Sequence, residues 1–201
     1  MRVRPAVFLD RDGTLVAEVP YLHEPDKVVL VDDAIPALRR LAAAGFALVV
    51  VSNQAGVARG YYPEQAVAAV HQRLEALLAA GGVALDGIFY CPHHPDGSVP
   101  GYARACRCRK PAPGMLETAA ASLRLDLPAS WMIGNHPSDV GAARAAGVRP
   151  LYVATGRASG KPSPPGVAAF PSLAAAVAAI LDRGAGAQAH TPAMRPGPPW
   201  P

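Results

Sequence analysis

Two carboxylates two positions apart, Asp10 and Asp12, follow a short apolar run and precede a glycine. A metal ion can bridge a carboxylate and a phosphate ester, so that the carboxylate attacks phosphorus and becomes phosphorylated. A second carboxylate nearby can protonate the leaving alcohol and then activate water. Gly13 would allow the sharp turn between the two groups. The same residues also suit an ordinary acidic turn after a strand.

Two further segments carry groups that suit a phosphoryl ligand. Ser52 follows an apolar run, and its hydroxyl could donate to a phosphoryl oxygen, although a helix N-cap is the commoner use of such a serine. Arg109 and Lys110 precede a proline and a predicted helix start. A lysine there could neutralise charge that develops during phosphoryl transfer, and the alternative is a solvated basic surface run.

All three cysteines of the chain, Cys91, Cys106 and Cys108, fall in one short segment with His93 and His94. Three thiolates and one imidazole form a closed tetrahedral zinc site. The odd number of cysteines argues against a disulfide framework, and unliganded thiols are the alternative. Either histidine could be the fourth ligand. The Pro- and Gly-rich loop has no core of its own, so the metal would have to order it.

Apolar strand-like runs alternate with helical patterns along the chain. Strands are predicted at residues 6–9, 46–51, 88–90, 131–133 and 151–153, and helices at residues 35–44, 63–80, 114–123, 138–146 and 173–181. This alternation predicts an α/β fold with a doubly wound parallel sheet. Since sites in such sheets lie beyond the carboxyl ends of the strands, Asp10, Ser52 and Asn135 should converge on one crevice.

Bulk properties narrow the class of protein. The 201 residues suit one domain, and the net charge of +4 is small and scattered, so we expect an anionic small molecule and no nucleic acid. No apolar run approaches the ~20 residues that span a bilayer, and no secretory signal is evident. We therefore expect a cytoplasmic monomer that does not bind membranes. Residues 184–201, rich in Gly, Ala and Pro, are predicted to be a disordered tail.

The motifs together resemble the phosphatases of the haloacid dehalogenase superfamily over residues 6–181. The Cys-Pro-His-His-Pro and Cys-Arg-Cys-Arg-Lys-Pro runs are similar to its zinc-loop branch, which includes heptose bisphosphate 7-phosphatases and histidinol phosphatases. The resemblance implies a Rossmann-like domain at residues 1–183, with a zinc-binding loop at 91–108 and no large cap domain. It also implies a catalytic Mg²⁺, a structural Zn²⁺ and a small phosphorylated sugar, which loses its 7-phosphate. Histidinol phosphate is the alternative substrate.

The resemblance also assigns roles by position. The catalytic residues would be Asp10, Asp12, Ser52 and Lys110. Substrate contacts would come from Glu18, Tyr21, Ser52, Asn53, Gln54, Ala55, Arg109 and Lys110. Mg²⁺ would be bound by Asp10, Asp12 through its backbone carbonyl, and Asn135, and Zn²⁺ by Cys91, His93, Cys106 and Cys108.

The fourth motif departs from the family pattern Gly-Asp-x-x-x-Asp. Asn135 stands where the family has a carboxylate that binds Mg²⁺. Its amide oxygen can still coordinate, but one negative charge is missing, so Mg²⁺ affinity should fall. Asp139 could compensate through a water or by orienting the ligands. The alternative is a weakened or inactive pseudo-phosphatase that binds sugar phosphates. A polynucleotide 3′-phosphatase shares the Asp-x-Asp loop, but the small basic surplus argues against it.

Overall fold

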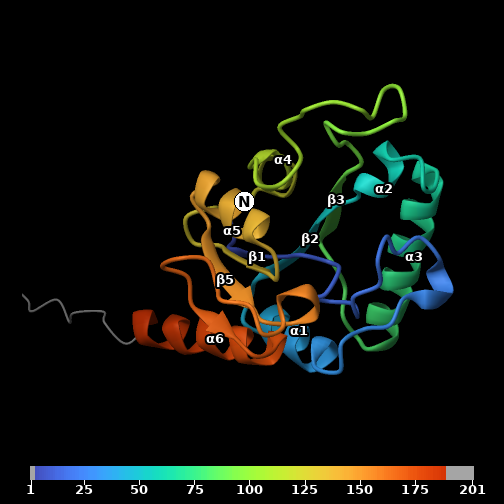
Figure 1. The fold of residues 1–201 in the computed structure, drawn as a ribbon. Coiled ribbons are helices and arrows are strands. Elements are labelled where there is room, and N and C mark those ends of the chain that lie inside the picture. Colours follow the sequence, from blue (N-terminus) through green and yellow to red (C-terminus); the bar gives the residue numbers. More distant parts are fainter. Residues whose placement is uncertain (1–2, 189–201) are drawn as a thin grey trace, which may run out of the picture.

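A computed structural model describes residues 3–188, with side chains described as far as residue 183. Its centre is a six-stranded parallel sheet in the order β3-β2-β1-β4-β5-β6 (Figure 1). The strands are β1 Ala6–Leu9, β2 Ala47–Asn53, β3 Gly87–Cys91, β4 Trp131–Gly134, β5 Arg149–Val153 and β6 Ala169–Phe170. The helices are α1 Ala34–Ala43, α2 Ala55–Ala58, α3 Glu64–Ala80, α4 Gly114–Leu123, α5 Pro137–Ala145 and α6 Leu173–Gln188, with 3-10 turns at Pro25–Lys27 and Gly156–Ala158.

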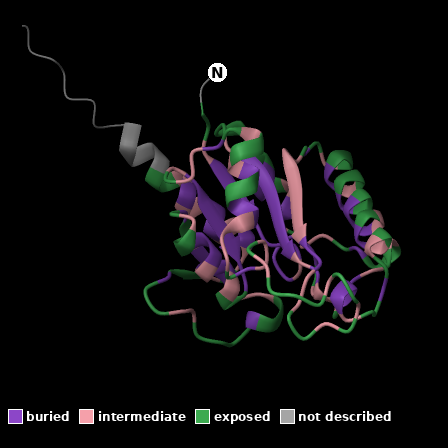
Figure 2. Cartoon of the chain, turned by 90° about the horizontal axis from the view of Figure 1, so that it is seen from above, coloured by how far each residue is buried: buried purple, intermediate pink, exposed green. Residues whose placement is uncertain are grey.

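The central strands are buried on both faces, as continuous apolar runs predict (Figure 2). Because side chains alternate along a strand, Val7 and Leu9 pack on one face with α1, α3 and α6. Ala6 and Phe8 pack on the other face with α4 and α5. The prediction of a doubly wound α/β sheet is therefore confirmed, and the described residues contain no large cap domain.

The strand order brings three carboxyl ends together. Strand β1 lies between β2 and β4, with Leu9 paired to Val50 on one side and to Ile133 on the other. The chain runs outward from β1 to β3 and then crosses back to β4, so the direction of winding reverses at β1. Such a reversal opens a crevice beyond the strand ends. Asp10 follows β1 at this point.

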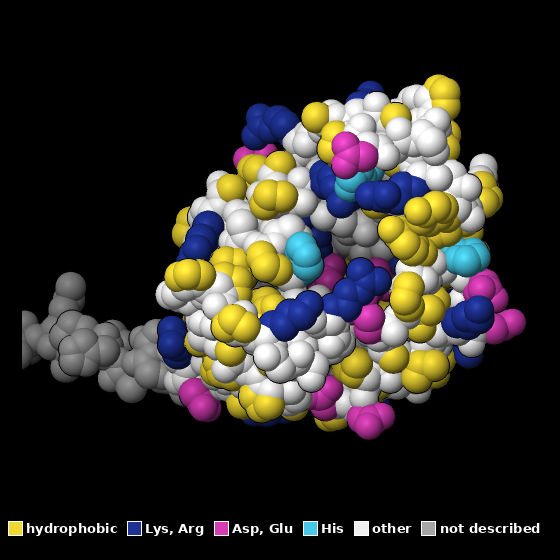
Figure 3. Space-filling view, viewed as in Figure 1, with side chains coloured by type: hydrophobic (Ala, Val, Ile, Leu, Met, Phe, Trp, Pro, Cys, Tyr) yellow, Lys and Arg dark blue, Asp and Glu magenta, His cyan; other side chains and the backbone are white. Residues whose placement is uncertain are grey.

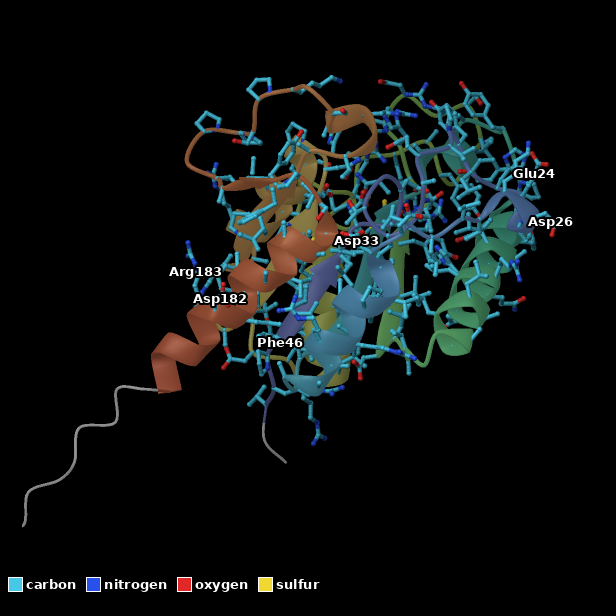
Figure 4. All side chains as sticks on the ribbon, turned by 90° about the horizontal axis from the view of Figure 1, so that it is seen from below. Glu24, Asp26, Asp33, Phe46, Asp182 and Arg183 are labelled. Atoms are coloured by element: carbon cyan, nitrogen blue, oxygen red, sulfur yellow. The ribbon has the colours of Figure 1, made fainter. Side chains whose placement is uncertain are left out.

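Helix α6 extends further than the sequence predicted. It begins beside α1, where the Asp33 carboxylate accepts the N–H of Ala174 at 2.6 Å, and α1 and α6 then pack together (Figure 4). The helix continues to Gln188, so the irregular tail predicted from residue 184 does not begin there. Residues 189–201 of that predicted tail lie outside the described residues. Within the described part of the chain, no helix has the length and apolarity needed to cross a membrane.

Candidate active site and zinc centre

A cavity of about 470 Å³ lies at the carboxyl end of the sheet. Figure 3 shows a hollow on this face, with basic and histidine side chains around it and acidic side chains inside. Every residue that the sequence predicted for catalysis, substrate contact or Mg²⁺ lines this cavity, namely Asp10, Asp12, Glu18, Tyr21, Ser52, Asn53, Gln54, Ala55, Arg109, Lys110, Asn135 and Asp139.

Lys110 is the buried cation at the centre of the cavity. Its ammonium donates to Asp10 Oδ1 and to the Val51 carbonyl, both at 2.7 Å, and it forms an ion pair with Asp139 at 2.7 Å. Burial lowers the pKa of Lys110, but the two carboxylates outweigh it and the pKa is raised overall. Lys110 is therefore charged at neutral pH and holds Oδ1 of Asp10 in place.

Asp12 is held by two neighbouring side chains. The buried guanidinium of Arg11 donates two hydrogen bonds to the Asp12 carboxylate, from Nε at 3.1 Å and from Nη2 at 3.0 Å. Gln54 donates both to Asp12 at 3.1 Å and to the Ser52 hydroxyl at 2.8 Å. Burial raises the pKa of Asp12, with Asp10 adding to the rise and Arg11 opposing it. A raised pKa suits a carboxyl group that must carry a proton to a leaving group.

The Asn53 side chain lines the cavity and also forms hydrogen bonds with the backbone of Lys110. Its amide nitrogen donates to the Lys110 carbonyl and its oxygen accepts the Lys110 N–H, both at 3.0 Å. This pair of bonds fixes the backbone of Lys110 against the end of β2. The sequence predicted only a substrate contact for Asn53, so this positioning contact is an addition to that prediction.

The fourth motif folds into the start of α5. The Asp139 carboxylate accepts the N–H of His136 at 2.9 Å, which closes a capping box. Asp139 is fully buried, and burial raises its pKa to about 6 against the opposing effect of Lys110. Asn135 directs its amide nitrogen to Glu18 at 3.4 Å and to the Thr155 carbonyl at 3.2 Å.

Four candidate zinc ligands lie together outside the set of residues that line the cavity. The ligand atoms of Cys91, His93, Cys106 and Cys108 all lie within 4.8 Å of one another. The sulfur-to-sulfur distances of 3.1 to 3.4 Å are too long for a disulfide. The set fits a zinc ion, which prefers four sulfur and nitrogen donors. His94 lies outside the cluster, with Nδ1 accepting the Asp96 N–H at 3.1 Å.

The segment that carries these ligands, residues 91–108, is called the zinc loop below. Its His94 lines the cavity, and it contacts the adjacent Arg109, whose Nη1 donates to the His93 carbonyl at 3.3 Å. On its outer side Tyr102 donates to Glu64 of α3 at 2.5 Å. The zinc loop is therefore placed to hold Arg109 at the cavity wall.

Several cavity and support residues were not predicted, among them Arg11, Tyr62, Arg59 and Arg157. Arg11 and Tyr62 form the buried framework, since Tyr62 donates to Gln54 at 3.2 Å. Arg59 and Arg157 add positive charge to the cavity wall. A buried arginine, or a tyrosine between Gly60 and Pro63, carries no spacing signal in the sequence that separates it from a surface residue.

The residues present also fit a hard divalent cation. Asp10, Asp12 and Asn135 all line the cavity, and they carry the carboxylate and amide oxygens that Mg²⁺ prefers as ligands. The fold and this arrangement are those of a haloacid dehalogenase-type phosphatase.

Comparison with known proteins agrees. A family described as Polynucleotide kinase 3 phosphatase matches residues 6–136, and one described as HAD-hydrolase-like matches residues 107–176. The D-glycero-beta-D-manno-heptose-1,7-bisphosphate 7-phosphatases of Yersinia pestis and Escherichia coli K12 are each 47% identical over 154 residues, or 76% of this chain and 82% and 81% of theirs. The solved D,D-heptose 1,7-bisphosphate phosphatase of B. bronchiseptica, complexed with magnesium and phosphate, has a TM-score of 0.77 and 32% identity and covers 89% of this chain and 99% of its own. This chain belongs to the heptose bisphosphate phosphatase family.

Proposed function

We propose that this phosphatase removes the 7-phosphate of D-glycero-D-manno-heptose 1,7-bisphosphate and leaves heptose 1-phosphate for nucleotide-sugar synthesis. The observation that carries the proposal is Lys110 held at 2.7 Å from Asp10 inside a cavity lined by every predicted substrate contact. The likeness to relatives named for this reaction supports the choice of substrate.

The Asp10 carboxylate attacks phosphorus, and the bond from phosphorus to the sugar oxygen breaks. Lys110 neutralises charge on Asp10 and on the transferring group. The Ser52 hydroxyl accepts from Gln54 at 2.8 Å, so its own hydrogen is left to donate to a phosphoryl oxygen.

Asp12 gives its proton to the departing sugar oxygen. It then takes a proton from the water that attacks the phosphorylated Asp10, which releases phosphate. The bonds from Arg11 and Gln54 fix Asp12 for both steps. Its raised pKa favours the protonated form that the first step needs.

Asp10, the backbone carbonyl of Asp12 and Asn135 would hold the catalytic Mg²⁺, which neutralises negative charge on the phosphate when bound. Zinc would be held by Cys91, His93, Cys106 and Cys108. A zinc ion there would have a structural role and would keep the loop and Arg109 in place.

The cavity wall suits a substrate with a second phosphate. Arg59 and Arg109 line it together with His94, and neither guanidinium forms an ion pair with a described residue. Burial and the charge of Arg59 both lower the pKa of Arg109, which indicates that the two cations lie near each other. A second phosphate would relieve this repulsion. Histidinol phosphate carries an ammonium group instead, which this wall would repel.

A phosphate-release panel tests the proposal with both anomers of the heptose bisphosphate, histidinol phosphate and a simple sugar monophosphate. We expect kcat/KM for a bisphosphate anomer to exceed the others by at least about tenfold, the effect of one lost interaction of about 1.4 kcal/mol. Arg59→Gln should raise KM for the bisphosphate more than for the monophosphate. Equal or faster release from histidinol phosphate would contradict the assignment.

We also propose that the protein acts as a cytoplasmic monomer. The support is that one chain supplies the whole described cavity wall and that the substrate is a small water-soluble sugar phosphate. Light scattering coupled to size exclusion should give a mass near 20.7 kDa. A stable dimer mass would contradict the monomer.

A further inference from the structure

The amide of Asn135 has a defined orientation. Two acceptors, Glu18 Oε2 at 3.4 Å and the Thr155 carbonyl at 3.2 Å, lie on one side of it. Only the amide nitrogen can donate to both, so the nitrogen must face them. Oδ1 is therefore turned away from Glu18 and Thr155, on a residue that forms part of the cavity wall.

Two glycines make room for the contact between Asn135 and Glu18. Gly13 has a φ of 75° and Gly156 a φ of 55°, and a Cβ atom on either would collide with Glu18 Oε2. At Gly13 the added atom would also collide with the Asn135 amide nitrogen. Thr155 adds a hydrogen bond of 2.5 Å to the Gly13 carbonyl. The contact between Asn135 and Glu18 therefore requires glycine at both neighbouring backbone positions, since any side chain there would occupy the same space.

Asp139 does not replace the charge missing at Asn135. Its carboxylate pairs with Lys110 at 2.7 Å and accepts the His136 N–H, so its charge already balances a buried cation. Glu18 is the carboxylate that contacts Asn135 within the described chain. Its other oxygen, Oε1, pairs with Arg157 at 2.8 Å, but the Arg157 side chain is 60% exposed, so water and salt screen its charge.

We propose that Asn135 and Glu18 act as a matched pair that replaces one metal-binding aspartate. Asn135 supplies the oxygen ligand, and Glu18 supplies the negative charge and holds the amide so that its oxygen faces the cation. The inference rests on the proposed function only in taking the cation to be the catalytic Mg²⁺. It makes the two residues interdependent, because an aspartate at position 135 would place two carboxylates in contact.

Metal binding without substrate tests the pair. The probe is Mn²⁺ added to zinc-loaded protein, with free Mn²⁺ counted by electron paramagnetic resonance and Mg²⁺ used as a competitor. Glu18→Gln keeps the shape but removes the charge, and it should weaken Mn²⁺ binding about tenfold, or about 1.4 kcal/mol. Asn135→Asp should lower the melting temperature of the Mn²⁺- and Mg²⁺-free protein. The double variant Glu18→Gln/Asn135→Asp exchanges the two groups and should recover both properties, with Mn²⁺ affinity within about threefold of the parent.

Glu24→Gln is the matched control. Glu24 is an exposed carboxylate paired with Lys27 at 2.7 Å on the outer edge of the molecule, and its loss should leave Mn²⁺ binding unchanged (Figure 4). Unchanged binding in Glu18→Gln, or a double variant no better than Glu18→Gln, would overturn the pairing. The result is separate from the substrate assignment: if the parent binds Mn²⁺ but does not hydrolyse the heptose bisphosphate, only the proposed function fails.

Discussion

The cavity is built from residues far apart in the sequence, whereas the zinc loop is built from neighbouring ones. Lys110 bonds to Asp10 across 100 residues and to Asn53 across 57, so the cavity is assembled by the sheet. The four candidate zinc ligands come from 18 consecutive positions, and no residue from 93 to 108 is buried. The segment projects from the sheet between β3 and α4 (Figure 1). The cavity is therefore formed by the core, whereas we expect the loop to depend on a bound metal.

Asp10→Asn tests the cavity at its centre and should have the largest effect. An amide cannot form the phosphorylated intermediate, so phosphate release should fall by at least about 10⁴-fold. Because the sheet forms the cavity, circular dichroism and zinc content should match the parent. A variant with near-normal turnover would remove Asp10 from the mechanism.

Asp12→Asn should slow hydrolysis of a sugar phosphate by about 10²–10⁴-fold, the usual effect of a lost general acid. For p-nitrophenyl phosphate the fall should be much smaller, because its leaving group needs little protonation. The ratio of the two rates is the measurement. An equal fall on both substrates would mean that Asp12 does not protonate the leaving group.

Cys108→Ser tests the other half of the comparison. Zinc, measured by mass spectrometry, should be lost, and kcat/KM should fall by about 10–100-fold because Arg109 loses its support. Hydrogen exchange should quicken in residues 93–108 but stay slow in β1 and β2. Asp96→Asn, an exposed change in the same loop, is the control. Faster exchange in the strands as well would show that the sheet also depends on zinc.

His71→Leu should have the smallest effect, on stability alone. His71 is buried on α3, and burial, helped by Arg11, lowers its pKa to about 3. Below a pH of about 6.5 the unfolded chain takes up a proton that the folded chain does not, so acid favours unfolding. The parent should lose on the order of 1 kcal/mol more than the variant per pH unit below about 6.5. Urea unfolding at two pH values measures this, and equal losses would contradict the buried neutral form.

Much of the fold could be predicted from the sequence because most strands and helices are marked by local sequence patterns. The apolar runs predicted β1 to β5, and glycine or proline marked most helix ends. The two-residue strand β6 and the four-residue helix α2 were missed, since such short elements show no periodicity. Which strands neighbour one another depends on crossovers, so the position of β1 between β2 and β4 followed only from the structure.

The candidate site was readable where motifs are contiguous. Asp10, Ser52 and Lys110 each lie in a short contiguous motif, and all three line the cavity. The contacts between Asn53 and Lys110 and between Glu18 and Asn135 join residues 57 and 117 positions apart, so no local spacing encodes them. Arg11 was missed for a further reason: a fully buried arginine is rare, and nothing beside it in the sequence sets it apart.

The two hydrogen bonds between Asn53 and Lys110 bear on how this enzyme can diversify. They anchor the chain just after the zinc loop directly to β2, whatever path the loop takes. We therefore expect that residues 94–105 can change in length and composition while Lys110 keeps its position. We expect the zinc loop to be exchangeable, so that a different loop grafted between the same two anchor points would change substrate preference and leave the residues around Asp10 intact.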